Sequence, residues 1–365
     1  MLKRLHLRNF TVFEDADFEF GPGLNVIVGA NGTGKSHVLK VGYAVEAIRE
    51  AIKNNKTQFA EDKLLAQYAN EKHHEWGIRL VFYLTDTFLA AGGLFNLIRI
   101  DSQPRKTFVD VAFGPEDERV SFEFAETQKP KDTSLDITSS ELTAGMAHTP
   151  VFVPAKEVLT MGWLLPLYDR REIPIDETYP DLLRLLMGPP LRQPEPAHIV
   201  AQLQKLIGGK VEEEGGRFYL ASPNQPRMEM NLVAEGFRKF ATLYKLLANG
   251  TLTPETTLFW DEPEANLNPA LLKEMAAVLA ELARAGFQII LATHSLFLLK
   301  ELHILSREKA TPVKYFGLSA KPGEATTVTA ADNLELLPDI VTLDAELEQS
   351  DHFQRILDQE DADHN

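Results

Sequence analysis

The sequence predicts an α/β fold with a mixed central sheet, a β-rich subdomain and a helical lobe. Short apolar segments at residues 24–28, 257–260 and 288–292 alternate with amphipathic segments of helical length, which is typical of strands buried between layers of helices. Strand-like patterns separated by Gly, Pro and Asp fill residues 78–124, which favours a β-rich subdomain. No sustained heptads occur, so we expect no long coiled coil.

The composition is that of a globular protein. Apolar residues make up 44% and charged residues 25% of the 365 residues, a length sufficient for two ordinary domains or one large α/β domain with an inserted lobe. No apolar run reaches the roughly 18 residues of a membrane span, and no signal-peptide pattern precedes the first strand, so we expect a cytoplasmic protein without membrane contact. The absence of cysteine leaves oxygen and imidazole as possible metal ligands.

The N-terminal elements follow from residue periodicity. Alternating and apolar patterns predict strands at residues 2–10, 16–20 and 24–28. A helix should begin at Lys35 or Ser36 and continue, with an interruption at 53–56, to about residue 68. Further strands are expected at residues 78–84, 97–100, 108–113, 119–124 and 149–153. The polar, proline-bearing stretch 127–140 is interpreted as a loop.

A leucine-rich stretch interrupted by prolines, residues 156–207, predicts a lobe of short helices that the glycine pair 208–209 ends. A hairpin should follow, with residues 210–211 against 217–220 and the glycines 215–216 at its turn.

The final third of the chain is predicted to be α/β again. Helices are expected at residues 234–249, 269–285 and 296–301, and strands at 257–260, 288–292 and, as edge strands, near 313–318 and 326–329. We therefore divide the chain into four parts: 1–155 with the glycine loop and the β subdomain, the helical lobe 156–207, a second α/β half 208–330, and an extension 331–365. The acidic residues 358–363 are interpreted as a solvated terminus.

Residues 29–36 form the pattern G-x-x-x-x-G-K-S between a predicted strand and a predicted helix. Glycines let the backbone approach phosphate oxygens, Lys35 brings a positive charge to the β- and γ-phosphates, and the Ser36 hydroxyl can bind Mg²⁺. The alternative is a glycine loop without a ligand, which the flanking strand and helix disfavour. We predict an ATP site with contacts from Asn31, Gly32, Thr33, Gly34, Lys35 and Ser36.

Two adjacent acids follow the apolar strand 257–260, at the carboxyl edge where ligands bind in α/β folds. Asp261 is expected to hold Mg²⁺, directly or through water, and Glu262 to polarise the water that attacks the γ-phosphate. The alternative is a solvated turn ahead of the helix that begins after Pro269.

The strand 288–292 leads into Thr293, His294 and Ser295. A histidine at the end of an inner strand can reach the γ-phosphate as a donor or sensor, so we predict a catalytic role for His294. Seven other histidines lack such a position and are interpreted as non-catalytic: His73, His74, His148, His198, His303, His352 and His364.

The order of these motifs resembles the ATP-binding cassette (ABC) ATPases. The strings at 24–36, 260–269 and 291–295 are similar to those of the RecF/SMC-like and OLD-like members in particular. The resemblance implies an ABC-ATPase head that uses ATP and Mg²⁺ and forms a homodimer or higher homo-oligomer around nucleotide. Similar proteins accompany bacterial anti-phage modules such as Septu and PARIS.

In such ATPases each head lends a signature loop to the nucleotide of the other head. The matching segment is 232–239, where Ala234 stands in place of a serine. The resemblance implies contacts in trans from Ala234, Gly236 and Arg238 or Lys239, with a slow hydrolysis rate. An ordinary amphipathic helix with a glycine cap is the alternative.

Two further segments match the family only loosely. Lys156 or Glu157 stands where a glutamine loop is usual, as a metal-proximal or lobe-coupling group, and a plain helix start is the alternative. Asn266 and Asn268 match a dimer-contact loop.

Three functions are compatible with these motifs. We favour a regulatory ATPase that controls a separate effector protein in bacterial anti-phage defence or a toxin–antitoxin-like module. A separate effector is expected because no Toprim-type nuclease pattern follows His294. The second is a RecF-like DNA-binding ATPase of repair or replication, although the net charge of −16 repels nucleic acid. Only a local basic stripe could overcome that repulsion, formed by residues such as Arg99, Arg105, Lys106, Lys129 and Lys131. The third, a transporter subunit, fits the altered signature loop poorly.

Overall fold

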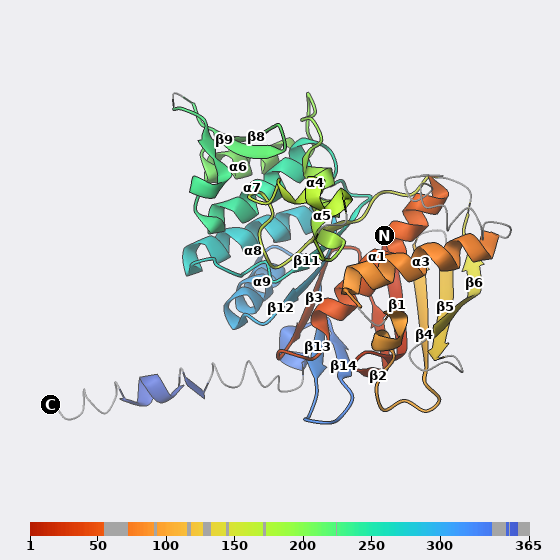
Figure 1. Ribbon diagram of the computed structural model, residues 1–365. Coiled ribbons are helices and arrows are strands. Elements are labelled where there is room, and N and C mark those ends of the chain that lie inside the picture. The colour runs from red at the N-terminus through yellow and green to blue at the C-terminus, as the bar shows by residue number, and fades with distance from the viewer. Residues whose placement is uncertain are drawn as a thin grey trace.

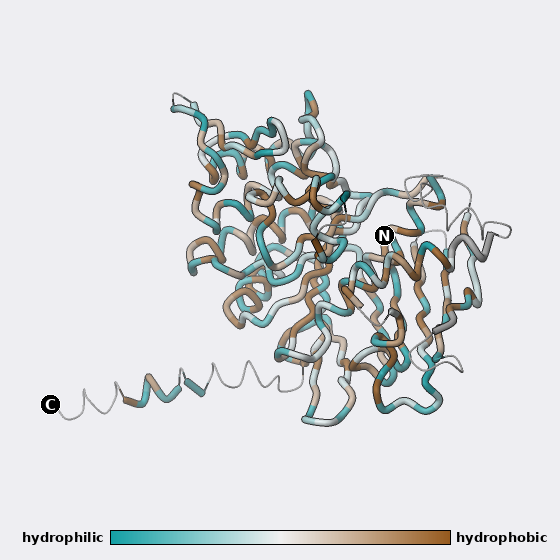
Figure 2. Tube along the Cα trace, in the orientation of Figure 1, coloured by the Kyte–Doolittle hydropathy of each residue, from teal (hydrophilic) through white to brown (hydrophobic). Residues whose placement is uncertain are grey.

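The computed structural model describes residues 1–54, 72–90, 93–114, 118–126, 133–143, 146–170, 173–223, 225–337, 348–349 and 351–356. Two sheets lie side by side in the larger part of the molecule, and a helical lobe sits above the central one (Figure 1). Hydrophobic residues follow the strands and the helix faces inside both parts, whereas the outer turns are hydrophilic (Figure 2). Within the described residues, no helix is long and apolar enough to cross a membrane.

The central sheet has six strands in the order β14-β13-β3-β12-β11-β7. They are β3 (Leu24–Gly29), β7 (Val151–Val153), β11 (Thr257–Asp261), β12 (Gln288–Thr293), β13 (Val313–Ser319) and β14 (Thr327–Ala331). All neighbours pair in parallel except β13 and β14, which are antiparallel, so the predicted mixed sheet is confirmed. The predicted edge position is right for β14 and wrong for β13, because β13 pairs with β3 on its other side.

Helices cover both faces of this sheet. On β11, Leu258 and Trp260 face a core shared with α7 (Glu235–Ala248), α8 (Pro269–Arg284) and α9 (Leu296–Glu308), whereas Phe259 faces a core shared with α1 (Lys35–Lys53). The alternation has period two because successive side chains of a strand point to opposite faces. Both faces are apolar, as the sequence pattern of these strands predicts.

The second sheet forms the β-rich subdomain, with strand order β2-β1-β4-β5-β6. Its strands are β1 (Leu2–Phe10), β2 (Phe13–Glu19), β4 (Lys106–Phe113), β5 (Glu118–Glu126) and β6 (Thr133–Glu141). The prediction of a loop over 127–140 is wrong for β6, whose polar residues suit an edge strand with little burial. Residues 127–132 lie outside the described residues.

Two strands predicted in this region are wrong. Residues 78–84 belong to the helix α3 (Lys72–Phe88), which buries Leu80 and Leu84 one helical turn apart and leaves Phe82 46% exposed. A short continuous apolar run does not distinguish a helix from a strand by periodicity. Of residues 97–100, Leu97 ends the 3₁₀ helix η2 (Gly93–Leu97), and only Ile98 makes a β-bridge, to Phe10.

The helical lobe contains α4 (Leu164–Asp169), α5 (Thr178–Leu186) and α6 (Ala197–Ile207). A small sheet β10-β9-β8 follows, with the predicted hairpin as β8 (Lys210–Glu214) and β9 (Arg217–Ala221), then β10 (Met228–Glu229) and the 3₁₀ helix η3 (Met230–Leu232). A last 3₁₀ helix, η4, spans Leu334–Leu336. The domain boundaries at 155, 207 and 330 stay predictions. The expected helix beyond residue 54 and the acidic stretch 358–363 lie outside the described residues.

The buried Glu118 of β5 joins the β-rich sheet to α1. Its side chain is 1% exposed, accepts a hydrogen bond of 2.6 Å from Arg49 Nε and pairs with Lys53. Burial by itself would raise the pKa of Glu118, but hydrogen bonds from Lys53, Thr143 and Arg49 outweigh it and lower the pKa to about 2.

We expect the Glu118→Gln substitution to lower the free energy of unfolding by about 3 kcal/mol at pH 7, because Arg49 and Lys53 lose their counter-ion at a buried site. The folded-state pKa of Glu118 lies below its ordinary value of 4.5, so its contribution is complete above pH 4.5 and is lost as the pH falls toward 2. Urea titrations at pH 7 and pH 3 should therefore show a smaller difference between variant and wild type at pH 3.

Asp17→Asn is the matched control, because Asp17 pairs with Arg4 on the surface, where both side chains are more than a third exposed. Its effect should stay below about 1 kcal/mol. An equal loss in the two variants would contradict the role assigned to Glu118.

Candidate nucleotide site

The register of the central sheet brings three chain segments to one edge. Strand β12 lies between β3 and β11, with Ala292 opposite Ile27 on one side and Asp261 on the other. Because the three strands are parallel, the loop after Gly29, the acid pair 261–262 and His294 leave the sheet at the same end. This is the edge at which the sequence places ligand chemistry.

The loop 29–36 is held in shape by its own backbone. Gly32 and Gly34 have φ values of +83° and +91°, the left-handed region that favours glycine. The Thr33 hydroxyl donates to Ala30 O at 2.8 Å, and Lys35 Nζ donates to Gly29 O at 2.8 Å and to Ala30 O at 3.0 Å. The buried ammonium therefore lies under the loop, where burial lowers the pKa of Lys35.

Helix α1 begins directly after this loop, and its N-cap Gly34 has no side chain to satisfy the first amides. Unpaired N–H groups at the start of a helix and the positive end of its dipole favour an anion. Together with Lys35 they could hold phosphate oxygens above the curved backbone of Asn31, Gly32 and Thr33, and we call this region the phosphate cradle.

Asp261 lies at the end of β11, close to the side chain of Ser36. Burial raises the pKa of Asp261, with Ser36 and Lys35 acting in the opposite direction. Within the described part of the chain, the Oδ1 atom of Asp261 is buried and has no hydrogen-bond partner. A buried carboxylate oxygen without a partner next to a serine hydroxyl fits Mg²⁺, which prefers one or two protein oxygens together with phosphates and water.

Glu262 has a left-handed backbone, with φ at +48°, and its N–H donates to Ala292 O at 2.9 Å. Its carboxylate lies 3.4 Å from His294 Nδ1, and both side chains are about one-third exposed or more, at 32% and 41%. The structure therefore brings the predicted base and the predicted sensor into contact, in a position that solvent reaches.

Sequence reasoning assigned no role to Glu264, which the structure places behind this pair. Glu264 is buried, accepts from the Thr293 hydroxyl at 2.6 Å and from the His294 N–H at 3.1 Å, and lies 3.6 Å from His294 Nδ1. These bonds connect the acid turn to the end of β12 and fix the backbone position of His294. The sequence signal that could have indicated Glu264 was its place directly after Pro263, in the same acidic turn as Asp261 and Glu262.

The predicted signature segment starts α7, with Ala234 as an N-cap that makes no side-chain hydrogen bond. A Cβ on Gly236 would lie 3.0 Å from Leu271 and 3.2 Å from Leu267, so close packing within the chain already favours glycine here. Arg238 Nη1 donates to Val233 O at 2.8 Å, and its Nε lies 2.9 Å from Glu157 Oε2. In this arrangement Arg238 binds its own chain, and its contact in trans stays a prediction.

Glu157, Asn266 and Asn268 also form contacts within the chain. Glu157 is buried at the start of the helical lobe, accepts from Leu159 N, and joins the lobe to α7 through Arg238, whereas Lys156 is exposed. Asn266 Nδ2 donates to Glu235 Oε1 at 2.8 Å, and Asn268 caps α8 by accepting from Leu271 N.

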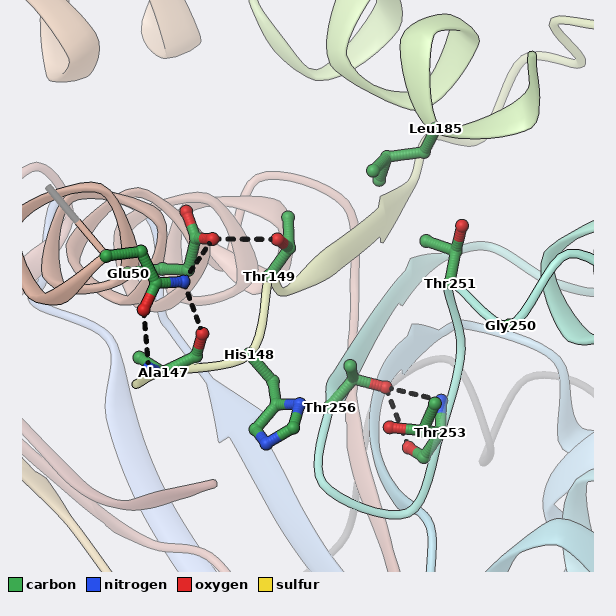
Figure 3. Close-up of a pocket in the computed structure, with 10 residues that line it drawn as sticks. Glu50, Ala147, His148, Thr149, Leu185, Gly250, Thr251, Thr253 and Thr256 are labelled. Carbon is green, nitrogen blue, oxygen red and sulfur yellow. Dashed lines mark hydrogen bonds between the residues drawn. The ribbon is translucent and has the colours of Figure 1, made fainter. Parts of the chain in front are cut away.

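A separate open cavity of about 320 Å³ lies near the opposite edge of the sheet (Figure 3). Its lining comes from the end of α1, from Leu185 of α5 and from segments that precede β7 and β11, and includes Glu50, His148, Thr251 and Thr256. Glu50 accepts from Asn54 and from Thr149 at its rim. The cavity is therefore distinct from the phosphate cradle.

A glycine loop before a helix, with an acid pair and a histidine at the ends of adjacent parallel strands, defines a P-loop ATPase of the ABC type. A protein-family model described as "AAA domain, putative AbiEii toxin, Type IV TA system" matches residues 24–300, more than half of the chain. The chain belongs to this family.

Among curated proteins, the chain is 28% identical over 170 residues to the DNA double-strand break repair Rad50 ATPase of Thermoplasma volcanium, covering 39% of this chain and 18% of Rad50. It is 48% identical over 44 residues to the DNA replication and repair protein RecF of Edwardsiella ictaluri, 12% of each chain. The matches thus span less than a fifth of these two relatives.

A solved structure, the SmcHead bound to the C-winged helix domain of ScpA, matches with a TM-score of 0.50 and 16% identity, covering 92% of this chain and 98% of that one. This likeness shows the fold, an SMC-type ABC head.

We predict that the two left-handed glycines respond differently to alanine. A Cβ on Gly34 would lie 2.6 Å from Val12 and 2.8 Å from Phe13, whereas a Cβ on Gly32 meets nothing within 4 Å. Gly32→Ala should cost only backbone strain of about 1 kcal/mol, and Gly34→Ala about 3 kcal/mol because overpacking adds to the strain. Thermal or urea unfolding without nucleotide measures both; equal losses would contradict the packing of Gly34 against β2.

Proposed function

We propose that this chain is a regulatory ATPase whose ATP-driven homodimerisation controls a separate effector protein in bacterial anti-phage defence. The observation that carries the ATPase role is the buried Asp261 Oδ1 without a partner, beside Ser36 and the phosphate cradle. The family description, which names a toxin of a Type IV TA system, supports a module with two components.

The chemistry assigned to each group follows from its position. Lys35 and the first amides of α1 bind the phosphates, and Ser36 with Asp261 would hold Mg²⁺, which supplies positive charge that stabilises the transferring phosphoryl group. Glu262 orients the attacking water, and His294, 3.4 Å from Glu262, donates toward the γ-phosphate. The accessible Glu262–His294 pair leaves room for a water and for a second copy of the chain.

Dimerisation is inferred from the signature segment at the start of α7. Ala234 lacks the hydroxyl that would touch the γ-phosphate of a second copy, so contact in trans rests on backbone amides near Gly236. This departure favours slow hydrolysis, with nucleotide acting mainly to hold the dimer closed.

A RecF-like role on DNA is the second candidate, and the Rad50 and RecF matches favour it. The acidic residues beside the predicted basic stripe weaken this candidate. Arg99 lies 3.7 Å from Asp101, Arg105 lies 3.6 Å from Glu126, and Lys106 lies 2.5 Å from Glu123. Each cation thus has an acid beside it, while Lys129 and Lys131 lie outside the described residues.

We expect Glu262→Gln to slow ATP turnover by several orders of magnitude and to preserve ATP binding, because the amide cannot accept the proton of the attacking water. The variant should accumulate as a closed dimer with ATP and Mg²⁺, seen by size-exclusion chromatography with light scattering. Lys35→Ala is the control, since it should weaken ATP binding itself and leave a monomer. Undiminished turnover in Glu262→Gln would show that the base is misassigned.

A gel-shift titration of duplex DNA at several salt concentrations separates the two candidates. For the regulatory ATPase we expect no shift at 150 mM salt with or without ATP, because surface acids offset the nearby cations. A strongly salt-dependent shift that requires ATP would favour the RecF-like role. ATP-dependent cleavage of nucleic acid by the purified chain would contradict the need for a separate effector. Co-purification of the neighbouring gene product with this chain would identify the effector.

A further inference from the structure

Lys239 is a buried lysine of α7 whose side chain ends at the acid turn. It is 3% exposed, and its Nζ donates to Glu262 O at 2.7 Å and lies 3.5 Å from Pro263 O. A buried ammonium carries a desolvation cost, which the pKa of Lys239, lowered to about 8 by burial, reflects. Glu264, Glu235, Glu262 and Asp261 surround it and act in the opposite direction.

The group that Lys239 holds is under backbone strain. Glu262 is not a glycine, yet its φ is +48°, a strained backbone conformation that a non-glycine residue keeps only where the surrounding structure imposes it. Its N–H is fixed to Ala292 O of β12, and its C=O is fixed by Lys239 of α7. The backbone of the predicted base is therefore clamped from two elements, one on each side.

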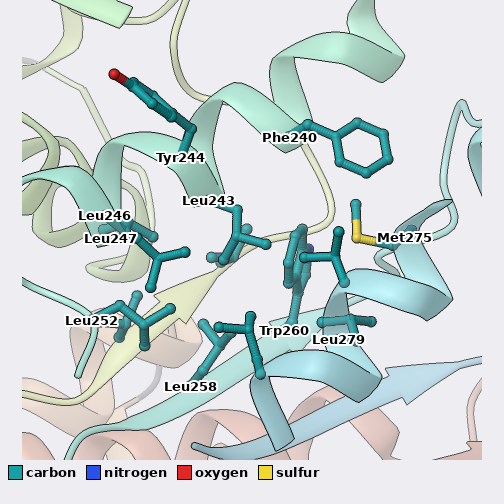
Figure 4. Close-up of a cluster of buried hydrophobic side chains, with 14 of the residues drawn as sticks. Phe240, Leu243, Tyr244, Leu246, Leu247, Leu252, Leu258, Trp260, Met275 and Leu279 are labelled. Carbon is teal, nitrogen blue, oxygen red and sulfur yellow. The ribbon is translucent and has the colours of Figure 1, made fainter. Parts of the chain in front are cut away.

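The helix that carries Lys239 is itself rigidly placed. Figure 4 shows Phe240, Leu243 and Leu247 of α7 packed over Leu258 and Trp260 of β11 and over α8. At its first turn, Glu235 accepts from Asn266, and the Gly236 position leaves only 3.4 Å between a Cβ and Asn266 O. The Lys239 ammonium thus contacts Glu262 from a helix that is fixed by packing, so the position of the ammonium determines the position of the acid turn.

We propose that Lys239 is a positioning residue for ATP hydrolysis, which holds Glu262 in its left-handed conformation so that the carboxylate faces the attacking water. The assignment rests on the proposed ATPase function. Lys239 does not touch the reacting atoms; it acts through the Glu262 carbonyl.

The test compares Lys239→Met with Lys245→Met. Lys245, on the same helix, is also 3% exposed and donates to a carbonyl, Gly188 O at 3.0 Å, away from the acid turn. Lys239→Met should lower kcat about 10- to 100-fold while the Kd for ATP changes less than about threefold, because misplacing a catalytic group by about 1 Å costs that much. Lys245→Met should leave kcat unchanged, and melting temperatures report the stability of both.

A double-mutant cycle with Glu262→Gln tests whether Lys239 acts through Glu262. In the Glu262→Gln background, Lys239→Met should lower the residual turnover by less than about twofold, since the group that it positions is already absent. Equal fold losses in both backgrounds would overturn the assignment. If Lys239→Met does not fold, Lys239→Arg, which keeps the charge and changes the donor geometry, takes its place in the same cycle.

The failure of this inference and that of the proposed function give different results. A wild-type chain that hydrolyses no ATP overturns the ATPase function and the assignment with it. Hydrolysis by the wild type, together with a Lys239→Met variant that has wild-type kcat, overturns the assignment alone.

Discussion

The parallel pairing of β3, β12 and β11 is the constraint on which the rest of the site depends. Each strand is short and apolar on both faces, so its side chains are fixed by cores on two sides. Parallel neighbours end together, and the polar residues that follow each strand must therefore share one edge. The phosphate loop, Asp261 and His294 converge for this reason, although Ser36 is 225 positions from Asp261 (261 − 36) and 258 from His294 (294 − 36) in the sequence.

The helical lobe is connected to this edge through charged groups that are buried. Glu157, at the start of the lobe, pairs with Arg238, and the next residue of α7, Lys239, binds the carbonyl of Glu262. Neighbouring residues of one helix thus face two different parts of the chain. Because buried ions must keep their partners, a shift of α7 would disturb both contacts. Through these two contacts, the proposed dimerisation at the start of α7 would affect the position of the acid turn.

The periodicity of the apolar residues predicted the strands of the central sheet. In the β-rich part it predicted β1, β4 and β5 but missed α3 and β6. The strands around the site are short and apolar, so β3, β11 and β12 were predicted within one residue. The apolar run at 80–84 fits a helix as well as a strand, and packing on the second sheet decided for α3. Conversely, β6 is polar because an edge strand buries little, so its sequence resembles a loop.

The sequence by itself determined the ATP-binding class, because a phosphate loop needs glycine, lysine and serine at fixed local spacing. It also named Asp261, Glu262 and His294, which stand directly at strand ends. Only the tertiary structure decided the partners of these groups. Ser36 lies beside Asp261, and His294 contacts Glu262. Glu264 accepts a hydrogen bond from Thr293, and Lys239 donates one to the carbonyl of Glu262. Such contacts join residues far apart in the chain, and no local pattern encodes them. For Lys239 the periodicity of α7 indicated only a helix and the family resemblance a contact in trans, whereas the structure buries it against the acid turn of its own chain.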